Sequence, residues 1–308
     1  MAQSSALSHP AGTRARWTTG RILRLLLLTL LGALFFVPIA TFVLMALRHE
    51  DSIGQVPGGI WSLDGVSIAN AQRSWDILSA FNHGIFSTWV MNSIVVAGGG
   101  AALAVFTAIP TGYALAKLRF RGRRVLRFIT LLTMVMPNTV LVIPLFLEVS
   151  AISAVGQFWP IIVIMGFYPF GVYLAYIHFA TTLPTELVEA ARLDGLSEIG
   201  VFWRIAVPVS KQAVALVVFF SFVANWTNYF LPLVLLPIDK QFTVSVGLQR
   251  LVGSSPLFDP TEAAGLDVRL YMPQLALATS LSIIPVLVVF VMAQRYLMRG
   301  QVMGAVKG

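Results

Sequence analysis

Long apolar runs separated by short polar segments dominate the order of residues along the chain. A helix needs about 20 mostly apolar residues to cross the hydrocarbon core of a bilayer. Six runs reach that length, at Leu25–Leu47, Trp89–Ala116, Val125–Leu147, Phe158–Ala180, Ala213–Leu236 and Met272–Ala293. The first run is longer than the apolar part of a signal peptide, and no small-residue cleavage pattern follows it. The pattern therefore predicts an all-α membrane protein with six transmembrane helices.

Composition and charge support a membrane location and predict an orientation. Only 11% of the 308 residues are charged, whereas soluble domains contain about 25% charged residues. Lys and Arg gather in the N-terminal tail, after the second and fourth apolar runs, and in the C-terminal tail. Because cytoplasmic loops carry an excess of basic residues, both termini are predicted to be cytoplasmic. The net charge of +8 then reflects topology, and we expect no binding of nucleic acid.

These signals divide the chain into three parts. We expect a cytoplasmic tail over residues 1–24, a six-helix transmembrane domain over 25–296 and a second cytoplasmic tail over 297–308. The chain has no cysteine, which excludes disulfides and thiolate metal sites, and its four histidines lack the spacing of metal ligands. We therefore expect no bound metal.

Proline and glycine are frequent inside the apolar runs. Each run contains proline, which removes a backbone donor and tends to kink a helix. Two interpretations remain open, namely bent helices around a gated path and the ordinary enrichment of proline in membrane helices. The small residues around Gly98–Gly100 favour close packing of helices over contact with a substrate.

The cytoplasmic segment 183–208, between the fourth and fifth runs, predicts two short helices joined by a turn. Thr185 is the expected N-cap of the first helix, and Asp194-Gly195 is the expected turn. Ser197 is the expected cap of the second helix, and Pro208 is expected to interrupt it. The apolar residues of this second helix recur with helical spacing, which predicts that Ile199, Phe202, Trp203 and Ala206 lie on one apolar face.

The first of these short helices combines a carboxylate with very small side chains at Glu189, Ala190 and Ala191. Small side chains permit close approach of another surface, and the carboxylate can pair with a basic residue across it. The residues therefore leave two interpretations, a docking surface for a partner and a loop that only covers the end of the bundle.

Amides inside the apolar runs are candidates for a substrate path. Buried polar groups are costly in a membrane unless they face the bundle or a water-filled path, and hydrogen bonds between helices are an equally good explanation. Sugars suit aromatic faces and amide partners, so Trp226 is the preferred candidate. The full set of candidates for the substrate path is Asn138, Asn225, Trp226 and Asn228.

The segment 183–208 resembles the EAA loop of permease subunits of ATP-binding cassette importers. The residues that carry the resemblance are Glu189, Ala190, Ala191, Asp194, Gly195, Phe202 and Pro208. The sequence departs from the family pattern at Leu196, where alanine is usual. The stretches Gly112–Ala116, Met136–Leu145 and Asn225–Leu233 are similar to the maltose-type sugar permeases, in particular to their smaller six-helix subunit.

This resemblance implies the type I importer permease fold in a bacterial cytoplasmic membrane. It implies a heterodimer with a second permease, two ATP-binding cassette ATPase subunits and an extracytoplasmic solute-binding protein. ATP and Mg²⁺ would be bound by the ATPase subunits, and this chain would bind no cofactor and would not be an enzyme itself. The transported solute would be a di- or oligosaccharide or a related compound.

The same resemblance assigns roles to the residues of the loop. Glu189 would pair with a basic residue of the ATPase, and Ala190, Ala191 and Gly195 would allow close seating. Asp194 and Gly195 would set the turn. Phe202 is included among the residues that couple the loop to the ATPase.

Other classes of membrane protein fit less well. An ion-coupled secondary transporter, the main alternative, is expected to carry acidic residues inside its spans, and Glu148 at the edge of the third run is the single candidate. An intramembrane serine protease is disfavoured because the fifth and sixth runs contain no histidine. The chain has no Gly-Lys pair and therefore no phosphate-binding loop of its own, as expected of a subunit driven by a partner ATPase.

Overall fold

The computed structural model describes residues 19–49, 61, 63, 65–265 and 267–304, and this part of the chain is helical without strands. The α-helices are α1 (Thr19–Ala46), α2 (Ile68–Ala80), α3 (Ile85–Lys117), α4 (Arg123–Val135), α5 (Val142–Ala151), α6 (Phe158–Gly166), α7 (Pro169–Thr182), α8 (Thr185–Leu193), α9 (Glu198–Val201), α10 (Val207–Val209), α11 (Lys211–Trp226), α12 (Phe230–Leu235), α13 (Val244–Gly253), α14 (Pro260–Ala263) and α15 (Met272–Gly304). The predicted all-α class is confirmed.

Four helical segments are long and apolar enough to cross a membrane, namely Gly20–Ala46, Ile85–Lys117, Phe158–Thr182 and Met272–Leu297. Two further pairs of helices qualify if each bent pair is counted as one span, which gives up to six spans. The count of six therefore stays a prediction. The predicted C-terminal tail begins inside a helix, because α15 continues to Gly304.

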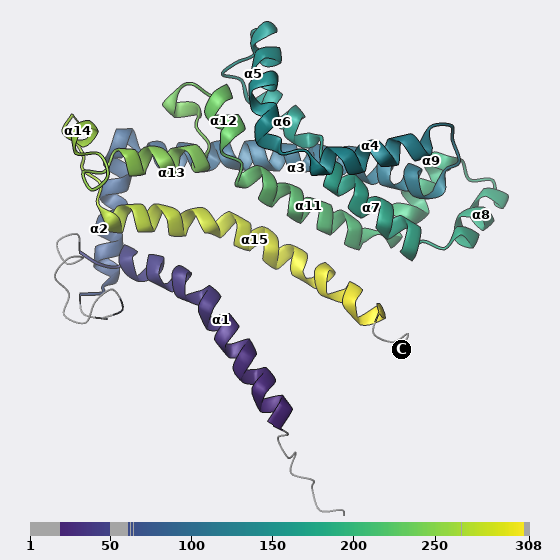
Figure 1. The fold of residues 1–308 in the computed structure, drawn as a ribbon, viewed down its shortest axis with the longest axis horizontal. Helices are drawn as coiled ribbons and strands as arrows, with labels where there is room; N and C mark the ends of the chain where they lie inside the picture. The colour runs from purple at the N-terminus through teal and green to yellow at the C-terminus, as the bar shows by residue number, and fades with distance from the viewer. Residues whose placement is uncertain (1–18, 50–60, 62, 64, 266, 305–308) are drawn as a thin grey trace, which may run out of the picture.

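The third predicted span, Val125–Leu147, is sharply bent. Its two halves, α4 and the segment Asn138–Ala151, meet at 94°. The break follows from Pro137, because a residue that precedes proline avoids the helical region, and Met136 has φ −68° and ψ 127°. As a result α5 projects from the side of the bundle instead of continuing α4 (Figure 1).

The fifth predicted span, Ala213–Leu236, is also divided. Helix α11 ends at Trp226 after 16 residues, and α12 begins only at Phe230. At its other end α11 meets the preceding helical segment, Glu198–Val209, at 77°. The sequence pattern shows one apolar run here because only the short stretch Thr227–Tyr229 separates the two apolar helices.

Helix α3 is the centre of the bundle and packs against α6, α7 and α11. Glycine makes these contacts close. A Cβ atom added at Gly112 would lie 2.5 Å from the Cβ atom of Ala175 in α7, and one at Gly100 would lie 2.5 Å from Nδ2 of Asn225 in α11. Small residues let helix backbones approach in this way, which positions α3 to connect both ends of the molecule.

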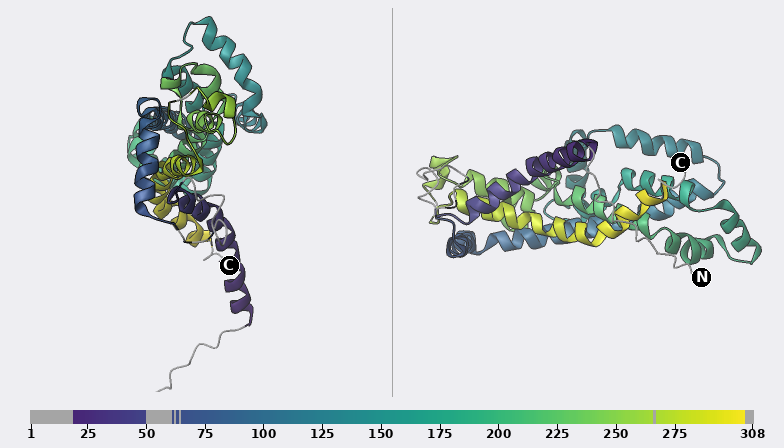
Figure 2. Two further views of the ribbon diagram at one scale, coloured as in Figure 1. Left: turned by 90° about the vertical axis from the view of Figure 1, so that its left-hand side faces the viewer. Right: turned by 90° about the horizontal axis from the view of Figure 1, so that it is seen from below.

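The two ends of the elongated molecule differ. One end carries α2, α13 and α14, and the other carries α8, α9 and the beginning of α4 (Figures 1 and 2). Helix α1 packs along α15, and the described start of α1 and end of α15 both point away from the α2 end. This arrangement agrees with termini that share one side of the membrane.

Candidate functional site

The segment 183–208 folds into a helical hairpin, the α8–α9 hairpin, at one end of the molecule (Figure 1). Helix α8 starts at Thr185, and the residue before it is Pro184, with φ −62° and ψ 139° and no side-chain cap. The prediction that Thr185 is the N-cap is therefore wrong, because Pro184 already supplies the extended backbone that a cap needs. Glu186 lies in the first turn, where a negative charge favours the helix.

The end of α8 is fixed by the backbone of the predicted Asp194-Gly195 turn. Gly195 has φ +84°, a conformation that glycine adopts without steric cost. Its N–H donates to the carbonyl of Arg192 at 3.1 Å, and the N–H of Leu196 donates to the carbonyl of Ala191 at 3.1 Å. This pair of bonds is the Schellman arrangement that ends many helices, and the predicted turn is confirmed.

The second arm of the hairpin starts as predicted but ends differently. The hydroxyl oxygen of Ser197 accepts a hydrogen bond from the N–H of Gly200 at 3.2 Å, which confirms it as the N-cap of α9. Residues Phe202–Ala206 then form a π-helical turn, η4. Pro208 lies inside α10, where it occupies the first helical turn, and the chain bends at Ser210. The prediction that Pro208 interrupts this arm is therefore wrong.

A bidentate ion pair joins the two arms. Nε of Arg192 lies 2.7 Å from Oε1 of Glu198, and Nη2 of Arg192 donates to Oε2 of Glu198 at 3.2 Å. The hydrogen bond to Glu198 raises the pKa of Arg192 above its already high ordinary value. Both side chains are partly exposed, so the pair adds little stability, and it links the last turn of α8 to the start of α9.

The small residues of α8 face in different directions. Glu189 and Ala190 are exposed, whereas Val188 and Ala191 are buried within the loop and its contact with the bundle. Ala191 is only 4% exposed, so its small side chain serves packing inside this chain. The expectation that Ala191 leaves room for a partner is therefore not supported by its position, whereas Ala190 and Gly195 have open space around them.

The predicted apolar face of the second arm is divided in the structure. Phe202 and Ala206 are buried, whereas Ile199 is 72% exposed and Trp203 is 58% exposed. The pattern assumed 3.6 residues per turn, and the π-helical turn η4 breaks that period. Together with Leu193, which is 90% exposed, these side chains give the hairpin an apolar outer surface.

Phe202 anchors the hairpin to the transmembrane bundle. Its ring centre lies 5.3 Å from that of Tyr113 in α3, and Tyr113 meets the ring of Phe179 in α7 edge to face at 5.5 Å. All three side chains are buried in one cluster. Phe202 therefore faces the bundle and not a docked partner. Sequence reasoning missed Tyr113, although this residue lies in a stretch, Gly112–Ala116, that resembles sugar permeases.

Trp226, the preferred candidate for contact with a sugar, is part of the core. It is 4% exposed and stacks on Phe222 with a distance of 5.6 Å between ring centres. Its Nε1–H donates to the carbonyl of Ser282 in α15 at 3.2 Å. The indole is thus covered by this chain in the structure, and contact between Trp226 and a sugar stays a prediction.

The three amides have unlike surroundings. Asn225 is buried, and its Nδ2 has no hydrogen-bond partner among the described residues. The Oδ1 atom of Asn228 accepts from the N–H of Leu231 at 3.3 Å, which caps the start of α12. Asn138 is exposed in the 3-10 turn η3 (Asn138–Leu141) at the bend between α4 and α5. The structure therefore places Asn225, Trp226 and Asn228 near the end of α11, and Asn138 on the surface of the α4–α5 bend.

A polar hollow lies at the end of the molecule opposite the α8–α9 hairpin. Its volume is about 310 Å³, and its lining includes His83, Asp239, Arg250 and Asp267. Nε of Arg250 lies 3.9 Å from Oδ2 of Asp239. Asn82 and His83 have positive φ values of 43° and 57°, which bend the chain sharply between α2 and α3.

Comparison with known proteins places the chain among permease subunits. It is 28% identical to the arabinooligosaccharides transport system permease protein AraQ of Bacillus subtilis (strain 168), with 94% of this chain and 96% of AraQ covered. It is 27% identical to the maltodextrin transport system permease protein MdxG of the same organism, with 94% and 96% covered.

A solved structure has the same fold. One chain of a bacterial ABC transporter involved in the import of the acidic polysaccharide alginate matches with a TM-score of 0.74 and 24% sequence identity, over 94% of this chain and 99% of that chain. The family model described as "Binding-protein-dependent transport system inner membrane component" matches residues 108–302, which include the whole hairpin. This chain therefore belongs to the family of inner membrane components of binding-protein-dependent transport systems, and it is a multi-pass protein of the cytoplasmic membrane.

Proposed function

We propose that this chain forms half of the translocation pore of an ATP-driven sugar importer and that the α8–α9 hairpin transmits the movement of a partner ATPase to the pore. The observation that carries this proposal is the two-sided construction of the hairpin. Its outer side exposes Glu189, Ala190 and Leu193, whereas its inner side is packed through Phe202 on Tyr113. Displacement of such a hairpin moves α3 through direct contact.

The roles of individual residues follow from their positions. Glu189 is exposed and pairs with a basic residue of the ATPase across the interface. Ala190 and Gly195 leave room for the ATPase surface to approach, and Asp194 and Gly195 hold the turn. Tyr113 and Phe202 carry displacement into the bundle. ATP and Mg²⁺ bind to the ATPase subunits.

The assembly in this proposal has four kinds of subunit. This chain pairs with a second permease, two ATPase subunits lie against the α8–α9 end, and an extracytoplasmic binding protein delivers solute to the end that carries α2, α13 and α14. The positive-inside distribution of Lys and Arg supports this orientation, with six spans and both termini in the cytoplasm. The large exposed apolar surfaces of α1 and α4 face lipid or the second permease.

The substrate class is a sugar of two or more units. Its support is the names of relatives that cover nearly the whole chain, which transport arabinooligosaccharides and maltodextrin. Trp226 remains the candidate for contact with the sugar, although its indole is covered by this chain in the structure.

Substitution at Gly195 tests the proposed role of the hairpin. A Cβ atom added at Gly195 would meet nothing within 4 Å beyond its chain neighbours, so Gly195→Val adds backbone strain at this positive φ and obstructs the approach of a partner. Uptake of radiolabelled maltodextrins and arabinooligosaccharides should fall at least tenfold with an unchanged amount of this chain in the membrane. Gly122→Val is the matched control, because Gly122 also has a positive φ, +89°, and open surroundings. Both variants carry roughly 1–2 kcal/mol of backbone strain, so normal uptake by Gly195→Val, or equal loss in both variants, would refute the role.

A further inference from the structure

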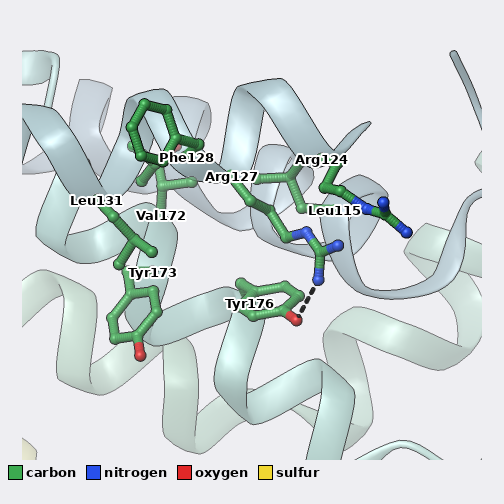
Figure 3. Close-up of a pocket in the computed structure, with 9 residues that line it drawn as sticks. Leu115, Arg124, Arg127, Phe128, Leu131, Val172, Tyr173 and Tyr176 are labelled. Carbon is green, nitrogen blue, oxygen red and sulfur yellow. Dashed lines mark hydrogen bonds between the residues drawn. The ribbon is translucent and has the colours of Figure 1, made fainter. Parts of the chain in front are cut away.

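A hollow of about 330 Å³ lies between α4 and α7 (Figure 3). Helix α4 begins at the end of the molecule that carries the α8–α9 hairpin (Figure 1). Two guanidinium groups, from Arg124 and Arg127 of α4, lie at one side of the hollow. Apolar side chains, from Phe128 and Leu131 of α4 and Val172 of α7, line the other side. The hollow is thus amphipathic, and none of the residues assigned to coupling or to a substrate path lines it.

The charged side of the hollow has unused hydrogen-bonding capacity. Nη1 of Arg127 donates to the hydroxyl oxygen of Tyr176 at 2.8 Å, and the guanidinium carbon lies 5.5 Å from the centre of the Tyr176 ring. A guanidinium has five N–H donors, and Nε of Arg127 has no partner among the described residues. In the part of the chain that the structure describes, no carboxylate forms an ion pair with Arg124 or Arg127.

The apolar side of the hollow continues onto the outside of the bundle. Four apolar side chains of α4 are more than half exposed, namely Val125, Phe128, Leu132 and Val135. From Arg124 to Leu131 the helix rises by about 10 Å. In the orientation given under the proposed function, the two guanidinium groups therefore lie nearer the cytoplasmic end of α4 than the apolar wall does.

We propose that this hollow is a binding site for an anionic phospholipid of the cytoplasmic leaflet. The phosphate is held by Arg124 and Arg127, with the Tyr176 hydroxyl orienting Arg127, and one acyl chain lies along Phe128 and Leu131. Basic pockets between transmembrane helices on the cytoplasmic side bind anionic headgroups in this way. A free phosphate ion would use the two arginines but leave the apolar wall uncovered. The assignment uses the orientation given under the proposed function and is independent of any contact with an ATPase.

Photolabelling with lipids tests the site. The full-length chain is placed in lipid nanodiscs that contain photoactivatable phosphatidylglycerol or, in a parallel sample, phosphatidylcholine with the same acyl chains. Labelled peptides are then mapped by mass spectrometry. We expect phosphatidylglycerol to label α4 and α7 more strongly than phosphatidylcholine does, and we expect Arg127→Gln to reduce this labelling about fivefold.

The control variant removes two charges from the loop that precedes α4, outside the hollow. Arg119 and Arg121 are exposed and do not line the hollow, so Arg119→Gln with Arg121→Gln should leave the labelling of α4 and α7 unchanged. Equal labelling by both lipids, or equal loss in the control, would overturn the assignment. Loss of labelling in millimolar inorganic phosphate would overturn it in favour of a free anion.

Two further measurements keep the test decisive. If Arg127→Gln does not reach the membrane, the unmodified chain is labelled at low and at high salt. Screening should weaken phosphatidylglycerol labelling at high salt, and an unchanged yield would contradict the proposal. Labelling is then repeated in native membranes, where its absence would show that a second subunit covers the hollow and would also contradict the proposal. Sugar uptake is measured separately, so failure of the lipid site and failure of the proposed transport function give different results.

Discussion

Single glycines show how closely the helices of this bundle approach one another. Gly98, Gly99 and Gly100 are consecutive in α3, yet a Cβ atom added at Gly98 would meet nothing within 4 Å, whereas one at Gly100 would lie 2.5 Å from Nδ2 of Asn225. The sequence favoured helix packing for the whole cluster, and the structure confirms this for Gly99, which lies against Ile162, and for Gly100. The contact with Asn225 also gives this buried amide a packing role.

Alanine substitution at these glycines should therefore have unequal effects. Gly100→Ala forces Asn225 or α11 to move, and overpacking of this kind costs about 1–3 kcal/mol. We expect a lower midpoint of thermal unfolding for the detergent-solubilised chain. Gly98→Ala, the control, should not lower the midpoint, because alanine favours helix and no neighbour is displaced. Equal midpoints for the two variants would contradict the close contact seen here.

At the same scale, the local features that sequence predicts well are those set by neighbours in the chain. The turn at Gly195 and the cap at Ser197 depend on backbone bonds within a few residues, and both are confirmed. The orientation of Ala191 and the covering of Trp226 depend on α3 and α15, which are distant in sequence. Nothing in the local pattern reports those contacts, so the surroundings of neither residue could be predicted.

The second arm of the α8–α9 hairpin has two neighbouring aromatic residues with opposite environments. Phe202 is 8% exposed and contacts Tyr113, whereas Trp203 is 58% exposed. Phe202→Ala should destabilise the chain by roughly 3 kcal/mol, as expected for loss of a buried ring. Trp203→Ala, its neighbour, should change stability by less than about 0.5 kcal/mol.

Uptake should respond differently from stability in these two variants. Phe202→Ala disconnects the hairpin from α3, so ATP-dependent uptake should fall even at temperatures where the variant is folded. Thermal unfolding in detergent and uptake in cells are the two measurements. A Phe202→Ala variant that retains both its stability and its uptake would show that the contact with Tyr113 does not carry the movement.

The sequence predicts a whole helix correctly where one apolar run forms one continuous helix. The runs that became α1, α3 and α15 are continuous in the structure. The runs at Val125–Leu147, Phe158–Ala180 and Ala213–Leu236 each divide into two helices. Proline marks the first break at Pro137, but hydropathy alone does not report a bend of 94°. The π-helical turn η4 has no signal in the apolar pattern, and the apolar side chains of Ile199, before the turn, and Trp203, within it, are exposed.

For the whole molecule, the orientation predicted from charge requires the loops of the two membrane sides to lie at opposite ends. The α8–α9 end and the α2–α13 end lie at opposite ends of the elongated molecule (Figure 1), as alternating loops require. The chain has no cysteine, so single cysteines report position without background. Leu257 and Leu193, at opposite ends, are 55% and 90% exposed, and each is a suitable labelling position.

A membrane-impermeant maleimide should distinguish these positions in right-side-out membrane preparations. Leu257→Cys should react in intact preparations, whereas Leu193→Cys should react only after the membrane is permeabilised. Reaction of Leu193→Cys in intact preparations would place the hairpin outside the cell and would exclude contact with a cytoplasmic ATPase.

The most direct test of the account is cross-linking from the outer side of the hairpin in native membranes. Ala190→Cys carries a short photoactivatable cross-linker, and Leu257→Cys at the opposite end is the control. The account predicts a cross-linked product between Ala190→Cys and a protein that mass spectrometry identifies as an ATP-binding cassette ATPase, with none from Leu257→Cys. Absence of that product, or an equal yield from both positions, would contradict the role of the α8–α9 hairpin as the site that couples this permease to ATP hydrolysis.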